Sequence, residues 1–423
     1  MIRLSFLGNG KLAVMASLIF KLAILSSCLI ISLSGCNSPQ GKSISDNPGL
    51  ALKNSAIVVS IAGDYRSYKH PGGGVAFYDP QKNEWSKLNN AGAQTSDIDF
   101  RDGKLYFGDY DTDYILSDTL VKIYRGYDSP YNENVKGLKN GGFVSAKNIK
   151  MTDEGYRYEY RIVESHDGKT SRNYPYMAWI SSLQRCEDDS MWSVVAEYTR
   201  DPEKYTYAPE SPLVLIKVAP DGNEEVVLRQ ELHAPQGGAF FQCIDHRIIG
   251  IQDIYSSENK EKNLGPEDAV GSILVIFDTQ KNTVQQIRIS GYKAQRINKD
   301  MFQSEIAEPW YSDGEIYWIS GDGEVISTNI ETGVNTKRLD LDKSTFGKSP
   351  SELKDQGMFY WGKGYLFNLY MDDSLNHNIL RIYDVKKGEM VKKKEVPKID
   401  VVVGKSQYPY KMIITNEKEL LNL

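Results

Sequence analysis

The sequence predicts an all-β protein built from repeated four-stranded sheets, because two kinds of β-hairpin alternate along most of its length. The first kind has an apolar strand, an Asp-containing turn and an alternating strand, as in "GVAFYDPQKNEWSKL" (74–88) and "ILVIFDTQKNTVQQIRI" (273–289). The second has two strands around a Gly-containing turn, as in "DIDFRDGKLYFGDY" (97–110) and "PWYSDGEIYWISGD" (309–322). No useful helical period competes with these strands. Two hairpins per unit form the four-stranded blade of a β-propeller.

Further copies of both hairpins follow along the chain. The first kind recurs at 213–228, 324–339 and 380–396, and its first strand alone recurs at 119–126. The second kind recurs at 178–198, 239–254, 357–370 and 410–423. The repeated unit therefore extends over nearly the whole chain, as in other repeat architectures.

The spacing of the first hairpin's turns gives the number of blades. These turns fall at Asp79, Arg125, Ala219, Asp278, Ile330 and Asp384. One gap, of 94 residues, is about two units long, and "YRYEYRIVESHDGKT" (156–170) fits a degenerate copy in its middle. Seven blades are expected, and six blades with a long insertion are the alternative.

The folded body begins and ends in the middle of a unit. "AIVVSIAG" (56–63) has the pattern of a second strand that lacks its first, and "YKMIIT" (410–415) has the pattern of a first strand. Pairing these two segments would close the ring and leave no open sheet edge. The sequence thus predicts one propeller domain over residues 56–423.

The strand pattern resembles the YVTN-type and quinoprotein-like propellers of bacterial envelopes. The resemblance covers most of residues 56–415, although the YVTN tetrapeptide itself is absent. It implies the fold, whereas function has to be argued from a site.

The first 35 residues have the features of a secretory signal peptide. They contain Arg3, Lys11 and Lys21, no acidic residue, and an apolar or small stretch at 22–34. "LSGC" (33–36) then resembles the bacterial lipobox, whose cysteine is acylated after cleavage before it. That resemblance implies palmitate-type acylation of Cys36 and attachment to a lipid bilayer; an ordinary cleaved signal is the alternative.

Residues 36–55 are expected to form a lipidated cysteine followed by a polar, flexible tether. Asn37 follows the cysteine where an aspartate commonly retains lipoproteins at the inner membrane of enteric-type bacteria. The expected location is therefore the cell envelope, at the outer membrane.

Composition argues against nucleic acid as a partner. The chain has 50 basic and 56 acidic residues, and removal of residues 1–35 takes three basic ones, so the mature charge is −9. A mildly acidic protein does not favour phosphate backbones.

No catalytic, cofactor or metal motif is present. The sequence lacks a G-x-S-x-G elbow, an H-E-x-x-H pair, a P-loop and a dinucleotide fingerprint. "DYDTD" (109–113) has acidic residues at calcium-loop spacing, but Tyr114 and Leu120 stand where such a loop needs Gly and Glu. A solvated acidic turn is expected there, and the sequence predicts no cofactor, no metal and no assigned catalytic residue.

Long loops gather on one side of the predicted ring. Connections between second and third strands are expected at 64–73, 109–118, 199–212, 253–271 and 370–378. They share a side with the connections from fourth to first strands, which we call the loop face; the other side is the short-turn face. Long loops on a rigid scaffold usually carry function.

The candidate binding residues are loop tyrosines and two carboxylates nearer the axis of the ring. They are Tyr65, Tyr68, Tyr110, Tyr205, Tyr207 and Tyr255, with Asp97 and Glu308 deeper in. Tyr174, Gln236 and Tyr408 are expected beside the axis as well. Tyrosine offers a large contact area at low entropy cost and suits protein and sugar ligands.

Two functions are compatible with this pattern. The first is a binding or scaffold module that holds an envelope protein or glycan through its loop face. The second is a glycan lyase or hydrolase that uses carboxylates near the axis. The lack of a paired His–carboxylate or metal set favours binding.

Cys186 and Cys243 are predicted to form a disulfide. Each stands two residues before a turn Asp, in consecutive units, and the compartment is oxidising. Two small buried hydrophobic residues are the alternative.

Overall fold

A computed structural model describes residues 42–44, 47–63, 72–129, 131–132, 134–152, 155–163, 171–176, 183–196, 213–218, 224–230, 241–255, 269–294, 297, 308–342, 357–371, 374–404 and 406–423. Residues 42–423 form one compact unit. Cys36, Tyr65, Tyr68, Tyr205, Tyr207 and Gln236 lie outside the described residues.

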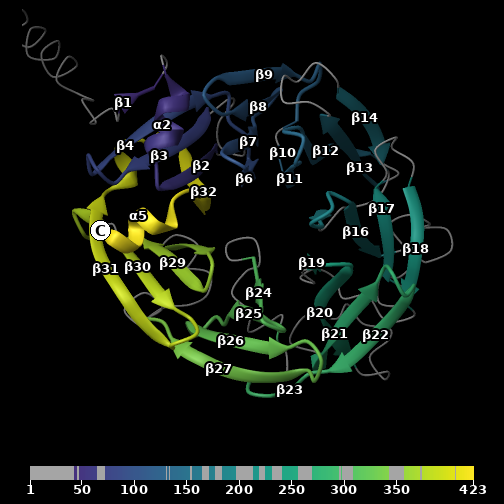
Figure 1. Cartoon of the computed structure of the whole chain (residues 1–423). Coiled ribbons are helices and arrows are strands. Elements are labelled where there is room, and N and C mark those ends of the chain that lie inside the picture. Colours follow the sequence, from purple (N-terminus) through teal and green to yellow (C-terminus); the bar gives the residue numbers. More distant parts are fainter. Residues whose placement is uncertain are drawn as a thin grey trace, which may run out of the picture. The chain divides into compact units, whose positions relative to one another are not determined.

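Seven antiparallel four-stranded sheets surround a common axis, so the predicted all-β propeller is confirmed with seven blades (Figure 1). The strands of each blade follow one another from the innermost to the outermost. Blade 1 consists of β32 (Gln407–Ile414), β2 (Ile57–Gly63), β3 (Gly73–Asp79) and β4 (Glu84–Asn90). Blade 2 consists of β6 (Ile98–Arg101), β7 (Lys104–Gly108), β8 (Thr112–Leu116) and β9 (Leu120–Tyr124). Blade 3 consists of β11 (Asn134–Gly137), β12 (Phe143–Thr152), β13 (Gly155–Val163) and β14 (Ser171–Tyr176).

The remaining four blades follow the same order. Blade 4 consists of β15 (Leu183–Arg185), β16 (Met191–Ala196), β17 (Leu213–Val218) and β18 (Glu224–Gln230). Blade 5 consists of β19 (Phe241–Ile244), β20 (Arg247–Tyr255), β21 (Ala269–Asp278) and β22 (Thr283–Arg288). Blade 6 consists of β24 (Trp310–Ser312), β25 (Glu315–Ile319), β26 (Glu324–Asn329) and β27 (Val334–Asp340). Blade 7 consists of β28 (Gly357–Trp361), β29 (Tyr365–Tyr370), β30 (His377–Asp384) and β31 (Glu389–Pro397).

Short elements complete the unit. β1 (Lys42–Ser43) adds to the outer edge of blade 1, β23 (Ser290–Gly291) adds to blade 6, and β5 (Thr95–Ser96) pairs with β10 (Tyr131–Asn132). The helices whose full bounds lie in the described part of the chain include α2 (Pro48–Asn54), α5 (Glu417–Asn422) and the 3-10 turn η6 (Ile399–Val401). Within the described part of the chain, no helix combines the length and the apolar character that crossing a bilayer requires.

The chain ends close the ring as the sequence predicts. β32 pairs antiparallel with β2, with Ile414 opposite Ile57 and Met412 opposite Val59. The C-terminal strand is therefore the inner strand of blade 1, whose other three strands come from the start of the folded body. The closure removes the open edge that β2 would otherwise present.

Strand alternation builds the core between blades. Val58 of β2 packs with Phe107 and Leu116 of blade 2, whereas Val59 packs with Phe367 and Leu380 of blade 7. Successive side chains of a strand point to opposite faces, so both faces of β2 are covered and all seven residues are buried. Apolar clusters of this kind lie between all seven pairs of neighbouring blades.

The predicted flexible tether of residues 36–55 is wrong at residues 42–43 and 48–54, which are ordered on the blades. Lys42 and Ser43 pair with Ser86 and Lys87 of β4, and Pro48–Asn54 is helical. The Asn47 side chain accepts a hydrogen bond from the Leu50 N–H at 3.0 Å and so caps the first turn of α2. Leu52 is buried against β-strand residues of blades 1 and 2, which holds the helix in place.

The expected loop at 109–118 is also wrong. Residues 112–116 form β8, the third strand of blade 2, and the second-to-third connection is only 109–111. The segment 119–126, expected as a third strand, contains β9, the fourth. The polar residues of "DYDTDYIL" suggested a solvated turn. In the structure Asp109 and Asp113 are buried, and the segment from residue 112 is a strand.

Candidate functional site

A group of charged side chains joins the inner strands of several blades. We call it the central charge cluster; its members are Asp97, Asp99, Arg101, Lys136, Arg185, Asp189, Glu308 and Lys411. They come from blades 1, 2, 3 and 4 and from the segment that leads into blade 6. Some of its ion pairs, such as Asp99 with Arg185, join blades that are not neighbours.

Lys411 of β32 is the hub of this cluster. Its Nζ lies 2.6 Å from Asp97 Oδ1 and 3.0 Å from Glu308 Oε1. Burial by itself lowers a lysine pKa, but the two carboxylates outweigh it and hold the pKa of Lys411 well above its ordinary value. Lys411 is therefore a permanent cation beside two predicted site residues.

Asp97 ties three blades together. It precedes β6 of blade 2, accepts a hydrogen bond from the Val135 N–H of blade 3 at 2.8 Å, and accepts one from Lys411 of blade 1. The residue is buried, with 4% of its surface exposed. Both of its carboxylate oxygens are thus engaged, which suits a fixed anion that orients its neighbours.

Glu308 sits differently from Asp97. Its side chain is 60% exposed, yet its two oxygens contact two ammonium groups, Lys411 at 3.0 Å and Lys136 at 4.0 Å. The nearby charges, Lys136 first and Lys411 second, lower its pKa to about 2 from the usual 4.5, although burial opposes the shift. Glu308 is therefore ionised at any physiological pH.

The rest of the cluster continues along β6 with a period of two. Asp99 accepts hydrogen bonds from the Gly137 N–H at 2.7 Å and from Arg185 at 2.6 Å. Arg101 pairs with Asp189 at 2.5 Å, in the turn after β15. Alternate residues of a strand point to the same face, so Asp97, Asp99 and Arg101 all turn away from the packed apolar side of β6.

Sequence reasoning identified Asp97 and Glu308, and the structure brings both onto one lysine. It missed Lys411, Lys136, Arg185, Asp99 and Arg101. The signal was present as charged residues at alternate positions in "DIDFR" (97–101) and as the single lysine in "NVKG" (134–137). Partners hundreds of residues apart, such as Asp97 and Lys411, cannot be assigned from such a pattern alone.

The remaining predicted positions do not join the cluster. Tyr110 lies in the short turn between β7 and β8, where its carbonyl accepts a hydrogen bond from the Ser129 N–H at 2.7 Å. Tyr255 is the last residue of β20 and pairs with Ala269, so it lies in a strand rather than in a loop. Tyr174, expected beside the axis, lies in β14, the outer strand of blade 3, opposite Tyr160. Tyr408 is in the inner strand β32, and its hydroxyl donates to the Gln94 carbonyl at 2.5 Å.

The predicted disulfide is present in the structure. Cys186 and Cys243 are bonded, with their Cα atoms 5.1 Å apart. They join the turn after β15 in blade 4 to β19 in blade 5. Among the described residues, no group of three or more His, Cys, Asp or Glu side chains is placed to hold a metal ion.

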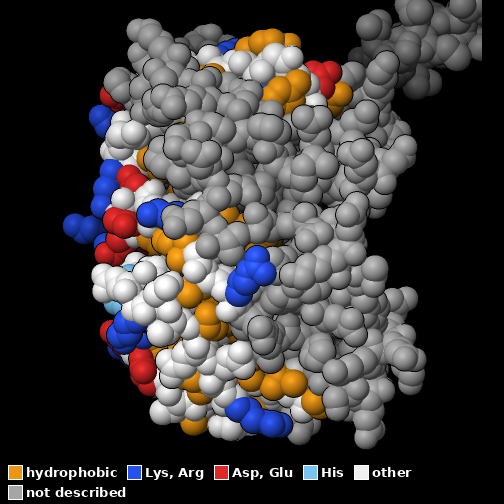
Figure 2. Space-filling view, turned by 90° about the vertical axis from the view of Figure 1, so that its right-hand side faces the viewer, with side chains coloured by type: hydrophobic (Ala, Val, Ile, Leu, Met, Phe, Trp, Pro, Cys, Tyr) orange, Lys and Arg blue, Asp and Glu red, His pale blue; other side chains and the backbone are white. Residues whose placement is uncertain are grey.

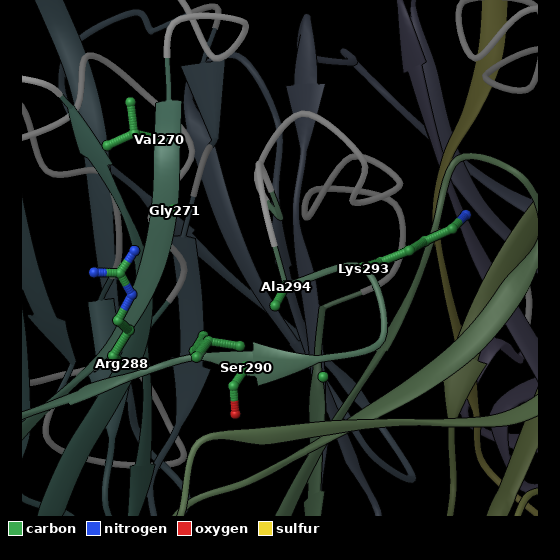
Figure 3. A pocket seen from close by; sticks show the side chains of 8 residues that line it. Val270, Gly271, Arg288, Ser290, Lys293 and Ala294 are labelled. Carbon is green, nitrogen blue, oxygen red and sulfur yellow. The ribbon is translucent and has the colours of Figure 1, made fainter.

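A separate open pocket of about 470 Å³ lies between the strands of blades 5 and 6 (Figure 3). Its lining includes Val270, Gly271, Arg288, Ser290 and Lys293. Lys293 extends away from Arg288 and pairs with Glu324 at 2.7 Å, so the two cations do not converge on one point. None of the predicted binding residues lines this pocket.

Comparisons with known proteins bear on the fold. Residues 252–415 match the sequence model of the YycP β-propeller domain. No curated protein sequence matches the chain.

Two of the solved structures that resemble the chain do so at low sequence identity. Cobalt-substituted ACO, the apocarotenoid oxygenase of Synechocystis, has a TM-score of 0.46 at 11% identity, covering 89% of this chain and 98% of that one. Apo AztD from Citrobacter koseri has a TM-score of 0.39 at 12% identity, covering 85% and 83%. Scores this low support no statement about function. The match to the YycP propeller model and the seven sheets together identify the chain as a β-propeller protein.

Proposed function

We propose that this chain is a lipid-anchored protein of the bacterial envelope whose loop face binds an envelope protein or a glycan. The anchor rests on the lipobox pattern at Cys36 in the sequence. The described body begins at Lys42, only six residues after that cysteine. The binding role rests on Asp97 and Glu308 of the central charge cluster, which come just before the inner strands β6 and β24 and so stand at their loop-face ends.

The observation that carries binding over catalysis is the pairing of Asp97 and Glu308 with one lysine. Because both carboxylates touch Lys411, their oxygens lie within about 6 Å, a separation that a retaining glycosidase could use. Such an enzyme also needs one carboxyl whose pKa is raised, so that it can donate a proton. Glu308 has the opposite property, with a pKa of about 2, and Asp97 is saturated by a lysine and a backbone N–H. The contacts of this pair of carboxylates suit ion pairing rather than proton donation.

The surface character agrees with a partner that is not a polyanion. In the view of Figure 2, basic and acidic side chains are intermixed along one edge and neither sign dominates. The acidic net charge of the mature chain disfavours a partner that carries many negative charges.

Capture from detergent-solubilised envelopes tests the binding role. The bait is the mature protein. One variant carries alanine in place of the loop tyrosines Tyr65, Tyr68, Tyr205 and Tyr207. A matched variant carries alanine at four positions in turns of the short-turn face, Gln81, Lys281, Glu331 and Lys387. We expect the tyrosine variant to lose most of the captured partner and the matched variant to keep it. Equal losses from both variants, or turnover of a cell-wall glycan that requires Asp97 or Glu308, would replace binding by another function.

The anchor is tested separately by metabolic labelling with a fatty acid. The wild-type protein should take up the label, and Cys36→Ala should not. Label that persists in Cys36→Ala would exclude attachment through this cysteine.

A further inference from the structure

The Glu308 carboxylate bridges two cations that belong to different blades. Oε1 is 3.0 Å from Lys411 of blade 1, and Oε2 is 4.0 Å from Lys136 of blade 3. Glu308 itself belongs to neither blade, since it precedes β24 of blade 6. One oxygen for each ammonium is the arrangement that a bound carboxylate would adopt between two lysines.

The other anions of the central charge cluster already have cations of their own. Asp97 lies at 2.6 Å from Lys411, Asp99 at 2.6 Å from Arg185, and Asp189 at 2.5 Å from Arg101. Arg101 also lies 3.6 Å from Asp102, whose side chain is 71% exposed. The balance that bears on the site is that of Lys136 and Lys411, for which Asp97 supplies one negative charge. Glu308 is the further anion, and it shares Lys411 with Asp97 while facing Lys136. Without its charge, the two lysines would present excess positive charge to the axis of the ring.

The two lysines and Glu308 differ in how far their side chains are exposed. The lysine side chains are held in the wall, with 18% of Lys411 and 15% of Lys136 exposed, whereas Glu308 is 60% exposed. An anion that enters along the axis can therefore take the place of the Glu308 carboxylate without disturbing the strands that carry the lysines.

We propose that Lys136 and Lys411 form a binding subsite for a ligand carboxylate, and that Glu308 occupies it as an internal substitute until the ligand arrives. This inference rests on the proposed binding function and specifies the ligand's chemistry. The carboxylate can come from a uronic acid or from the free α-carboxyl of an amino acid. Because Glu308 is tethered, it competes at a high effective concentration and keeps the affinity of the wild-type site low.

The test measures small carboxylates against variants by isothermal titration, with the full mature protein in detergent. The probes are D-glucuronate and N-acetylalanine, with glucose and N-acetylalanine amide as neutral analogues. If Glu308 fills the subsite about nine-tenths of the time, Glu308→Gln should tighten the apparent Kd of the preferred carboxylate about tenfold. Neutral analogues should not bind, and the probe that binds more tightly identifies the source of the carboxylate.

Three further variants make the result decisive. Lys136→Gln combined with Glu308→Gln should remove the gained affinity. Glu331→Gln is the control: Glu331 is 68% exposed, pairs with Arg247 and is not part of the central charge cluster. This variant should bind the probes as the wild type does. Glu308→Ala provides a second route to the same gain. Equal affinities for wild type and Glu308→Gln, no binding to either, or binding unaffected by Lys136→Gln would overturn the subsite. Partner capture can succeed in any of these cases, so failure here is distinct from failure of the proposed function.

Discussion

Several charged side chains of this propeller are buried away from solvent. Asp113 accepts a hydrogen bond from Arg125 at 2.8 Å and lies 3.0 Å from Lys147, and no more than 1% of any of these side chains is exposed. The neighbouring Asp109 accepts hydrogen bonds from the Thr112 N–H and the Tyr114 hydroxyl. The acidic stretch at 109–113 is therefore a structural junction between blades 2 and 3.

We predict that Asp113→Asn strongly destabilises the protein. The substitution keeps the shape but leaves two buried cations without a balancing carboxylate, which typically costs about 3–5 kcal/mol of unfolding free energy. Lys82→Gln is the control, because Lys82 is 59% exposed in its pair with Asp79 and should change stability by less than about 1 kcal/mol. Chemical denaturation measures both; similar small effects would show that the junction does not need its carboxylate.

The pKa of Glu308 predicts a pH dependence with a definite sign. Its folded-state pKa of about 2 lies below the usual 4.5, so its ion pairs stabilise the folded state fully above pH 4.5. That contribution falls as the pH drops from 4.5 towards 2. The stability difference between wild type and Glu308→Gln should therefore be constant from pH 5 to 7 and shrink below pH 4.5. A difference that persists unchanged at pH 2.5 in thermal melts would contradict the pairing.

The candidate site was predictable only in part. Position in the connections between units was enough to select Asp97 and Glu308, because those connections converge at one side of any propeller. Their partners were not predictable, since Lys411 follows Asp97 by 314 positions and the ring brings them together only on closure. Tyr65, Tyr68, Tyr205 and Tyr207 stay predictions as loop residues that bind a partner.

At the scale of elements, turn chemistry explains which hairpins the sequence reveals. Asp102-Gly103 and Asp313-Gly314 both have positive φ at the two turn positions, as the tight turns of two-residue hairpins require. These hairpins were correctly predicted as β6–β7 and β24–β25. The third strand of blade 2 was not predicted as a strand, because it begins with the polar residues Thr112 and Asp113. The buried ion pairs that let Asp113 stand in a strand come from Lys147 of β12 and from Arg125, the residue that follows β9.

The disulfide is an element-scale clamp between blades 4 and 5. It closes a loop of 57 residues, and loops of that size contribute about 3–4 kcal/mol by restricting the unfolded chain. Reductant alone should lower the unfolding free energy of the wild type by this amount, measured as a lower denaturant midpoint, without changing its packing. The double substitution Cys186→Ala with Cys243→Ala should show no further response to reductant. A wild-type midpoint that does not move on reduction would show that the bond adds nothing to stability.

At the scale of the whole molecule, two-sided burial accounts for how well the fold could be predicted. Each middle strand packs one face on the previous blade and one on the next, which demands apolar runs such as "IVVSIAG" in β2. Those runs, repeated at regular spacing, are visible in a single sequence. The added strand β1 and helix α2 were not visible, because "NPGLALKN" contains only one helical turn's worth of apolar residues, and packing on blades 1 and 2 decides its structure.

Ring closure gives the last prediction. β32 supplies Met412, Ile413 and Ile414, each buried to within 4% exposure, and pairs along the length of β2. A chain that stops after residue 406 would expose the β2 edge and open the apolar clusters on both sides of blade 1, so it should bind hydrophobic dyes and lose cooperative unfolding. A chain that stops after residue 416 keeps β32 and loses only α5, with the buried Leu420. We expect that longer chain to melt cooperatively at a moderately lower Tm. If the two truncated chains melt alike, blade 1 does not depend on its C-terminal strand, and the ring is held by the packing between blades alone.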